Sequence, residues 1–426
     1  MVFCAREQPQ QPYSLLRAAP LALAAWIVLQ RLTFMRSADF QGDLYAFRTQ
    51  TLCLFACFVA FYLTESLCRE ARRCRRIVSV LLALALGEAF YGLAQHLLGW
   101  PYILTHKDPG FLGAATGTYI NHDHFAGFLE MIFPFCVSLA MMHSAPIRER
   151  TKRRIASKFL SRLGGASFQK TIILVLAGVT IFVAIVFSQS RMGLVAAAVS
   201  LVAIKIASAT HRDGARAAIL AAALLAAGVI AALWIGAGPV ITHFATLPQE
   251  AATNTVLGSR ISIWRDSFIL LLKHPLTGLG LGAFPYAFTR VQDTFVNLIV
   301  LHAHNDYLEY AVELGIPAAL LLFVMILAVF AGILRVCRRT PRDKSGAAAL
   351  GALGGVVALL LHSLVDFNLH IPANALVFSV ILGVGSAVAH IPREAHGRRR
   401  THGQRRSSRV LHATPEYAGG AVRPGS

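Results

Sequence analysis

The sequence predicts an all-α polytopic membrane protein with about ten transmembrane helices. Its 426 residues are 56% hydrophobic and only 14% charged, whereas a soluble globular protein carries about 25% charged residues. Apolar runs such as 172–187 are continuous, unlike the alternating pattern of membrane β-strands. Because lipid offers the backbone no hydrogen-bond partners, such runs must form helices.

Ten segments meet the length of about 20 apolar residues that a spanning helix needs. On one side of the bilayer, two of the connections between them are long, at about 99–122 and 238–306. The second is a large loop between the seventh and eighth spans. The predicted spans are 19–35, 47–67, 77–98, 123–143, 170–188, 191–209, 216–237, 307–334, 346–365 and 372–390.

Basic residues define the orientation of the chain. Most of the 40 lysines and arginines lie in alternate connections, such as 69–76, 148–170 and 335–344, and in the tail 391–426. Basic connections remain in the cytoplasm, so we expect both termini there and the two long connections outside. The net charge of +19 then reflects orientation and contact with anionic lipid, and we expect no nucleic-acid partner. The tail is expected to be disordered.

The seven cysteines fall in predicted helices or cytoplasmic segments. We therefore expect no disulfide framework. The first apolar run leads into further spans, which predicts that no signal peptide is cleaved.

The large outer loop contains an amphipathic stretch from Arg260 to His274. Ile261, Trp264 and Phe268 follow a helical spacing within it. We expect a helix that lies on the outer membrane surface or dips into it.

The outer side also collects polar side chains from five separate segments. Ionisable groups at membrane depth are costly, so a functional role is their default interpretation. The candidates are Asn121, His122, Asp123 and His124 at the fourth span; Ser190 and Arg191 between the fifth and sixth; Arg260 and Arg265; His302, His304, Asn305 and Asp306 before the eighth; and His362, Asp366 and His370 around the last turn.

These residues have structural interpretations as well. Arg191 could extend to the membrane interface, and Arg260 and Arg265 could be solvated residues of an amphipathic helix. For Asp306 and Glu309 we favour a capping pair at the start of the eighth span.

His304 has the strongest functional interpretation. It precedes a predicted helix N-terminus, where backbone donors and the helix dipole attract an anion. A phosphate there would also bind arginines, whose planar guanidinium groups match its oxygens. A histidine titrates near neutral pH and could accept a proton from a hydroxyl. The combination suits transfer from a lipid diphosphate.

Two other classes of function remain open. A flippase or transporter for lipid-linked glycans would also need cationic groups, although along a central cavity at several depths. A metal-dependent membrane enzyme could use His122, His124, His302 and His304 as ligands.

The segment from His304 and Asn305 through nine residues to Gly315 resembles the signature of the bacterial O-antigen ligase and O-antigen polymerase superfamily. Further stretches are similar to that superfamily, in order over residues 111–385. They are 117–127, 190–193, Arg260 with Trp264 and the glycines 278, 280 and 282, and His362 to Asp366.

The resemblance implies a glycosyltransferase that takes a glycan from undecaprenyl diphosphate on the periplasmic face and transfers it to an acceptor hydroxyl. It implies a GT-C-like architecture in the bacterial inner membrane and no metal or other cofactor. His304, Arg191 and Arg260 match the family's catalytic positions, and Asp366 matches a late acidic position. We also predict substrate binding by Arg265, Asp366, His370, His122 and His124.

The resemblance suggests three parts: transmembrane helices in 1–110, a ligase-like core in 111–390 and the tail 391–426. Where the ligase signature continues with Gly, Thr or Tyr, this sequence has Ala318. Ligase and polymerase activities therefore both remain open, with lipid A core, a growing glycan or a protein as acceptor.

Overall fold

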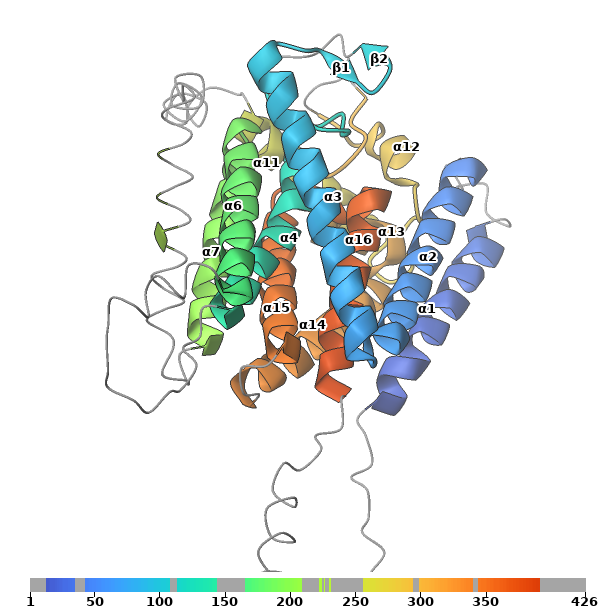
Figure 1. Cartoon of the computed structure of the whole chain (residues 1–426). Coiled ribbons are helices and arrows are strands. Elements are labelled where there is room, and N and C mark those ends of the chain that lie inside the picture. The colour runs from blue at the N-terminus through green and yellow to red at the C-terminus, as the bar shows by residue number, and fades with distance from the viewer. Residues whose placement is uncertain are drawn as a thin grey trace, which may run out of the picture. The chain divides into compact units, whose positions relative to one another are not determined.

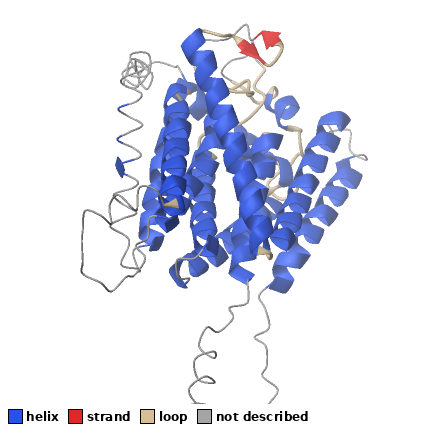
Figure 2. Cartoon of the chain, viewed as in Figure 1, coloured by secondary structure: helices blue, strands red, loops and turns tan. Residues whose placement is uncertain are grey.

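The chain folds almost entirely into helices, with one short hairpin among the described residues (Figures 1 and 2). This computed structural model describes residues 13–34, 43–107, 113–143, 165–208, 256–293, 299–339 and 344–390, with isolated positions between 222 and 230. Apart from those isolated positions, the predicted span 216–237 lies outside the described residues, as does the tail 391–426. The described residues up to His390 belong to one compact unit.

The described helices confirm a polytopic all-α protein. Six helices are long and apolar enough to cross a membrane, namely α2, α3, α4, α6, α7 and α14, and α1, α15 and α16 contain shorter apolar stretches. The elements are α1 (Tyr13–Phe34), α2 (Leu44–Cys68), α3 (Ala71–Leu98), β1 (Tyr102–Ile103), β2 (His106–Lys107), α4 (His122–His143), α6 (Ala166–Phe187), α7 (Arg191–Ser208), α11 (Val256–Lys273), α12 (Phe284–Phe288), α13 (Asp306–Leu314), α14 (Ile316–Arg339), α15 (Lys344–His362), a 3-10 turn (Asn368–His370) and α16 (Pro372–His390).

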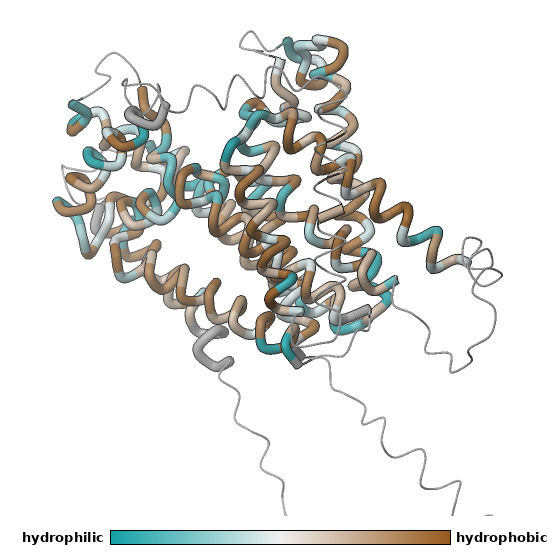
Figure 3. Tube along the Cα trace, turned by 90° about the vertical axis from the view of Figure 1, so that its left-hand side faces the viewer, coloured by the Kyte–Doolittle hydropathy of each residue, from teal (hydrophilic) through white to brown (hydrophobic). Residues whose placement is uncertain are grey.

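Helix α4 is the central helix of the bundle. Its apolar window is 89% buried, whereas that of α2 is only 11% buried, so α2 presents most of its surface to lipid. Helix α15 packs closely on α4 because Gly351, Gly354 and Gly355 face Phe135, Pro134 and Met131 of α4. Figure 3 shows hydrophobic residues along most helical turns and hydrophilic residues mainly toward helix ends and connections.

The predicted eighth span is wrong in one respect, because it consists of two helices. Helix α13 ends at Leu314 and α14 begins at Ile316. Gly315 separates them with a φ of +80°, a conformation that glycine alone adopts readily at ψ near 157°.

A second glycine loop packs against this break. An added Cβ on Gly278 would lie 2.3 Å from the Gly315 nitrogen, so both positions need glycine. The Gly280 amide donates to the Glu313 carbonyl at 2.8 Å, and the Ile316 amide donates to the Pro275 carbonyl at 2.8 Å. These bonds satisfy backbone groups that the helix break leaves open.

Helix α1 supplies two further hydrogen bonds to the C-terminal end of α13. The Trp26 indole donates to the Leu314 carbonyl at 2.8 Å, and the Gln30 amide donates to the Glu313 carbonyl at 3.0 Å. These side chains take the place of the helical bonds that the last carbonyls of α13 lack.

The predicted amphipathic helix forms as α11, four residues longer at its start. Ile263 and Leu270 are buried against the rest of the outer loop, whereas Ile261, Phe268 and Leu272 are exposed. This exposed apolar side suits contact with a membrane surface. Helices α11 and α12 and the β1–β2 hairpin lie toward the upper end of the helices in Figure 1.

The helix break yields a prediction about stability. In Gly315→Ala, the methyl group meets the Leu276 carbonyl at 2.3 Å at a positive φ, and we expect a loss of about 3 kcal/mol. Thermal unfolding in detergent measures it. Gly332→Ala in α14 is the matched control, because a Cβ there meets nothing within 4 Å. Equal melting temperatures of the two variants would contradict the packing described.

Candidate functional site

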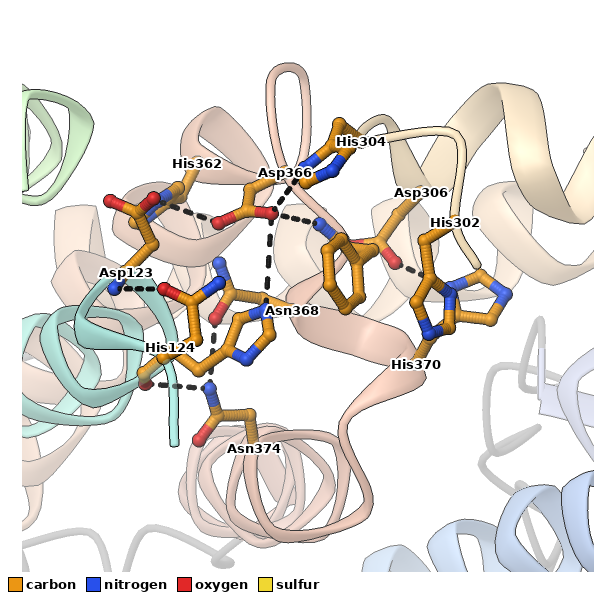
Figure 4. A network of polar contacts seen from close by, with 12 residues as sticks. Asp123, His124, His302, His304, Asp306, His362, Asp366, Asn368, His370 and Asn374 are labelled. Atoms are coloured by element: carbon orange, nitrogen blue, oxygen red, sulfur yellow. Dashed lines mark hydrogen bonds and ion pairs between the residues drawn. The ribbon is translucent and has the colours of Figure 1, made fainter. Parts of the chain in front are cut away.

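A single buried carboxylate, that of Asp366, lies at the centre of a polar network (Figure 4). Asp366 occupies the turn between α15 and α16 and is 1% exposed. Its Oδ1 is 3.3 Å from His304 Nδ1 and 3.9 Å from His124 Nε2. Its Oδ2 is 3.8 Å from His362 Nε2. Three imidazoles from three segments therefore meet at one side chain.

These imidazoles set the ionisation of Asp366. Burial alone would raise the pKa of Asp366, but the hydrogen bond from His304 and the charges of His362 and His124 outweigh it. The net effect holds the pKa well below its usual range. The amide of Phe367 also donates to Oδ1 at 2.9 Å. The carboxylate is thus ionised at neutral pH.

His304 is held in a strained backbone conformation beside this carboxylate. Its φ is +48°, which is uncommon for a residue with a side chain. The Trp264 indole of α11 donates to the His304 carbonyl at 3.3 Å. Because Nδ1 faces Asp366, the Nε2 edge is the one left to meet a substrate. The side chain is 29% exposed, so such a substrate could reach it.

The predicted arginines occupy different places. Arg260 of α11 lies 3.6 Å from the Asp123 carboxylate, with both side chains largely buried. Arg260 and Trp264 are one helical turn apart, so α11 contacts the site through two successive turns. Arg191 begins α7.

The start of α7 lies beside the start of α4. A Cβ on Gly193 would be 2.7 Å from the Ala126 Cβ, and Ala126 is two residues beyond His124. Arg191 therefore stands at the same end of the bundle as the network.

Arg265 does not join the network among the described residues. Its guanidinium contacts Asp266 at 2.9 Å and Asp293 at 3.2 Å, with 54% of the side chain exposed. His122 lies at the edge of the network, 3.7 Å from Asp123 and 39% exposed.

The predicted Asp306–Glu309 capping pair is wrong. Asn305 caps α13, since its side chain accepts from the Leu308 amide at 3.0 Å. Asp306 instead accepts from the Leu369 amide at 2.9 Å and contacts His370 Nδ1 at 2.7 Å. The Asp306 side chain therefore binds the distant residues Leu369 and His370 and does not cap α13.

A second buried network lies behind His304. His370 Nε2 is 3.6 Å from Glu309 and 3.7 Å from Glu313, in addition to its bond with Asp306. Glu309 also binds His302 Nδ1 at 2.7 Å and the Ala303 amide at 2.7 Å. Both residues that precede His304 are thereby fixed to α13.

The ionisation of His370 follows from these carboxylates. Burial would lower the pKa of His370, but Glu309, Asp306 and Glu313 together raise it well above the ordinary value. The imidazolium compensates part of the buried negative charge on α13.

Phe367 organises the imidazoles by contact. Its ring stacks on His302 at a centroid distance of 3.9 Å and meets His124 and His304 edge-on at 4.5 and 4.9 Å. One aromatic side chain thus separates and orients three histidines.

Two asparagines form the base of the site. The Asn374 amide donates to the His124 carbonyl at 2.9 Å and to Asn368 Oδ1 at 2.8 Å. Gly127 allows this contact, because a Cβ there would lie 2.2 Å from the Asn368 oxygen. The glycine of the 117–127 motif is explained by this close approach.

One group among the described residues has a composition that suits a metal ion. Donor atoms of Asp123, His362 and Asp366 all lie within 4.8 Å of one another. This group shares no member with the four histidines considered from the sequence. Arg260 lies close to Asp123, and its positive charge opposes cation binding there.

Some residues of the site were not selected from the sequence, notably Glu130, Glu313 and Phe367. Glu130 and Glu313 lie inside predicted apolar spans, where an ionisable residue is itself a signal. Phe367 gave no signal, since an apolar residue beside a span is ordinary.

A protein-family model described as O-antigen ligase matches residues 176–323. The matched segment contains Arg191, Arg260 and His304. It confirms the family resemblance that the motifs predicted. No curated protein matches the chain.

The His370 network yields a prediction about pH. Because the folded state raises the pKa of His370, its stabilising charge is present below the unfolded value of about 6.5 and is lost as pH rises through the folded value. We expect the melting temperature of the wild type to fall as the pH rises above 6.5, and that of His370→Gln to be lower at pH 6.5 and to change less with pH.

The matched control is His96→Gln. The imidazole of His96 contacts the Gly113 backbone carbonyl, whereas that of His370 contacts carboxylates. A wild-type profile as flat as that of His370→Gln would refute the charge assignment.

Proposed function

From the O-antigen ligase domain that the chain carries over residues 176–323, we propose that the protein transfers a glycan from undecaprenyl diphosphate to an acceptor hydroxyl. The family supports glycan transfer of the ligase or polymerase type in a membrane. The donor, the acceptor and the residue roles that follow are our proposal. The acceptor is a growing glycan, a lipid A core sugar or a protein side chain.

The observation that carries the proposal is the pairing of His304 with Asp366. A carboxylate on Nδ1 fixes the tautomer in which Nε2 lacks a proton, and it stabilises the imidazolium that forms later. The 3.3 Å contact and the partial exposure of the ring support this role. His304 Nε2 accepts the proton of the acceptor hydroxyl as its oxygen attacks.

Arginine provides the second half of the mechanism. As the acceptor oxygen bonds to the anomeric carbon, the bond from that carbon to the phosphate oxygen breaks, and the bonding electrons leave with undecaprenyl diphosphate. Arg260 and Arg191 stabilise this leaving group. Attack from the opposite face inverts the anomeric configuration.

The other predicted substrate-binding residues take lesser roles. His122 and Arg265 are exposed enough to contact the glycan, although Asp266 and Asp293 already bind Arg265. His124 and His370 are buried and act by positioning Asp366 and the His304 segment.

We place the reaction at the periplasmic face of the bacterial inner membrane. The basic connections support cytoplasmic termini, and the proposed catalytic groups stand at the opposite end of the helices. Cationic side chains along a central cavity, at several depths in the membrane, would instead support a flippase.

Transfer in proteoliposomes with purified lipid-linked glycan tests these roles. We expect His304→Gln to lower kcat by about 10²- to 10⁴-fold and Arg260→Gln by about 10²- to 10³-fold. Arg290→Gln, an exposed arginine of the same outer loop, is the control and should keep wild-type activity. Normal transfer by His304→Gln would refute the proposal.

The same assay separates the alternatives. A flippase would move labelled lipid across the bilayer and form no glycosidic bond. A metal enzyme using Asp123, His362 and Asp366 would lose activity with a chelator and recover it with a divalent ion. We expect bond formation that a chelator leaves unchanged.

A further inference from the structure

Glu130 is an ionisable residue within the apolar helix α4. It lies eight residues beyond His122, which corresponds to about 12 Å along a helix, and it is fully buried. Its Oε1 is 3.0 Å from His362 Nδ1. A buried charge without a partner costs several kcal/mol, so this contact accounts for the presence of the carboxylate. The mechanism proposed above does not use Glu130.

Each ring nitrogen of His362 faces a carboxylate, and a third carboxylate, that of Asp123, lies nearby and is itself 3.6 Å from Arg260. Nδ1 faces Glu130 at 3.0 Å, and Nε2 faces Asp366 Oδ2 at 3.8 Å. A neutral imidazole carries one N–H and would turn a lone pair toward one of the two carboxylates. The doubly protonated ring carries an N–H on each nitrogen, so that each carboxylate faces a donor and a positive charge. The geometry therefore favours an imidazolium at His362.

This imidazolium acts on His304 through Asp366. The same carboxylate faces His362 with Oδ2 and His304 with Oδ1 (Figure 4). A positive charge at His362 keeps Asp366 ionised. The ionised Asp366 in turn holds the Nδ1–H edge of His304 and leaves Nε2 to accept a proton.

We propose that Glu130 and His362 are positioning residues, which keep Asp366 ionised and His304 in its proton-accepting form. This inference rests on the proposed function, because it assigns His304 the role of base. Glu130 fixes the charge of His362, and His362 in turn fixes the charge of Asp366. Neither residue contacts the substrate.

A purely structural role explains this arrangement less well. An ion pair buried among apolar helices is often no more stabilising than an apolar pair of the same volume. Asp366 Oδ2 is buried, with no hydrogen bond among the described residues, and the 3.8 Å contact with His362 is longer than a hydrogen bond. The arrangement of Glu130, His362 and Asp366 thus controls the charge of Asp366 more than it stabilises the fold.

The test is Glu130→Gln, which keeps the hydrogen-bond acceptor for Nδ1 and removes the charge. His362 then loses the carboxylate that faces its Nδ1, and the positive charge beside Asp366 weakens. We expect kcat to fall about 10- to 100-fold at pH 7, as for other groups that orient an imidazole. The KM for the lipid-linked donor should change less than about twofold, and the acid limb of the pH–rate profile should move upward by about one unit.

Glu65→Gln is the matched control. Like Glu130, Glu65 is a glutamate within an apolar helix, in this case α2. Its carboxylate accepts a hydrogen bond from the Ser386 hydroxyl at 3.2 Å. We expect its pH profile to match that of the wild type. If Glu130→Gln instead lowers kcat by the same factor at every pH, the inference is overturned in favour of a structural role.

A double-mutant cycle with Asp366→Asn separates catalytic coupling from a partial loss of folded protein, because a folding loss lowers kcat by the same factor with or without Asp366. If Glu130 acts through Asp366, its substitution should cost at most twofold more in kcat once Asp366 is replaced. Full additivity would overturn the inference. Wild-type protein that forms no glycosidic bond would instead refute the proposed function, so the two failures are distinguishable.

Discussion

The structure of the site depends on one buried carboxylate. Asp366 is ionised although it is almost fully buried. The surrounding imidazoles stabilise its negative charge, which would otherwise be costly in an apolar helical bundle. His304, His124 and His362 come from the outer loop, α4 and α15 respectively. Their convergence on one carboxylate ties together segments that are far apart in the sequence. The charge that requires compensation is also the charge that orients the proposed base.

The break between α13 and α14 serves the same arrangement. Gly315 and Gly278 allow the end of α13 to pack directly against the segment 276–278. Helix α13 then directs Asp306, Glu309 and Glu313 toward His370, while Glu309 holds His302 and Ala303. Helix α11 braces His304 from the other side through Trp264. His304 is thus fixed between two elements, which supports its strained backbone.

The sequence predicted the all-helical character of the membrane protein because hydrophobicity is a local pattern. Hydrophobicity identifies spans residue by residue, and the His304–Gly315 signature marks one segment. Pairing across segments was not predictable. The Asp306–Glu309 cap failed because His370, 64 residues from Asp306, offers a buried charge partner. The position of Glu130 inside an apolar span was a signal, but its partner His362 was not predictable, because it lies 232 residues away.

The most direct test of the central role of Asp366 is the single-turnover rate of glycan transfer by Asp366→Asn, measured together with the Kd of the lipid-linked donor. An asparagine keeps the shape of the side chain but lacks the charge that fixes His304. The account predicts a rate about 10³- to 10⁴-fold below wild type, as for other carboxylates that orient a histidine base, with the Kd within about twofold. A rate within twofold of the wild type would contradict it.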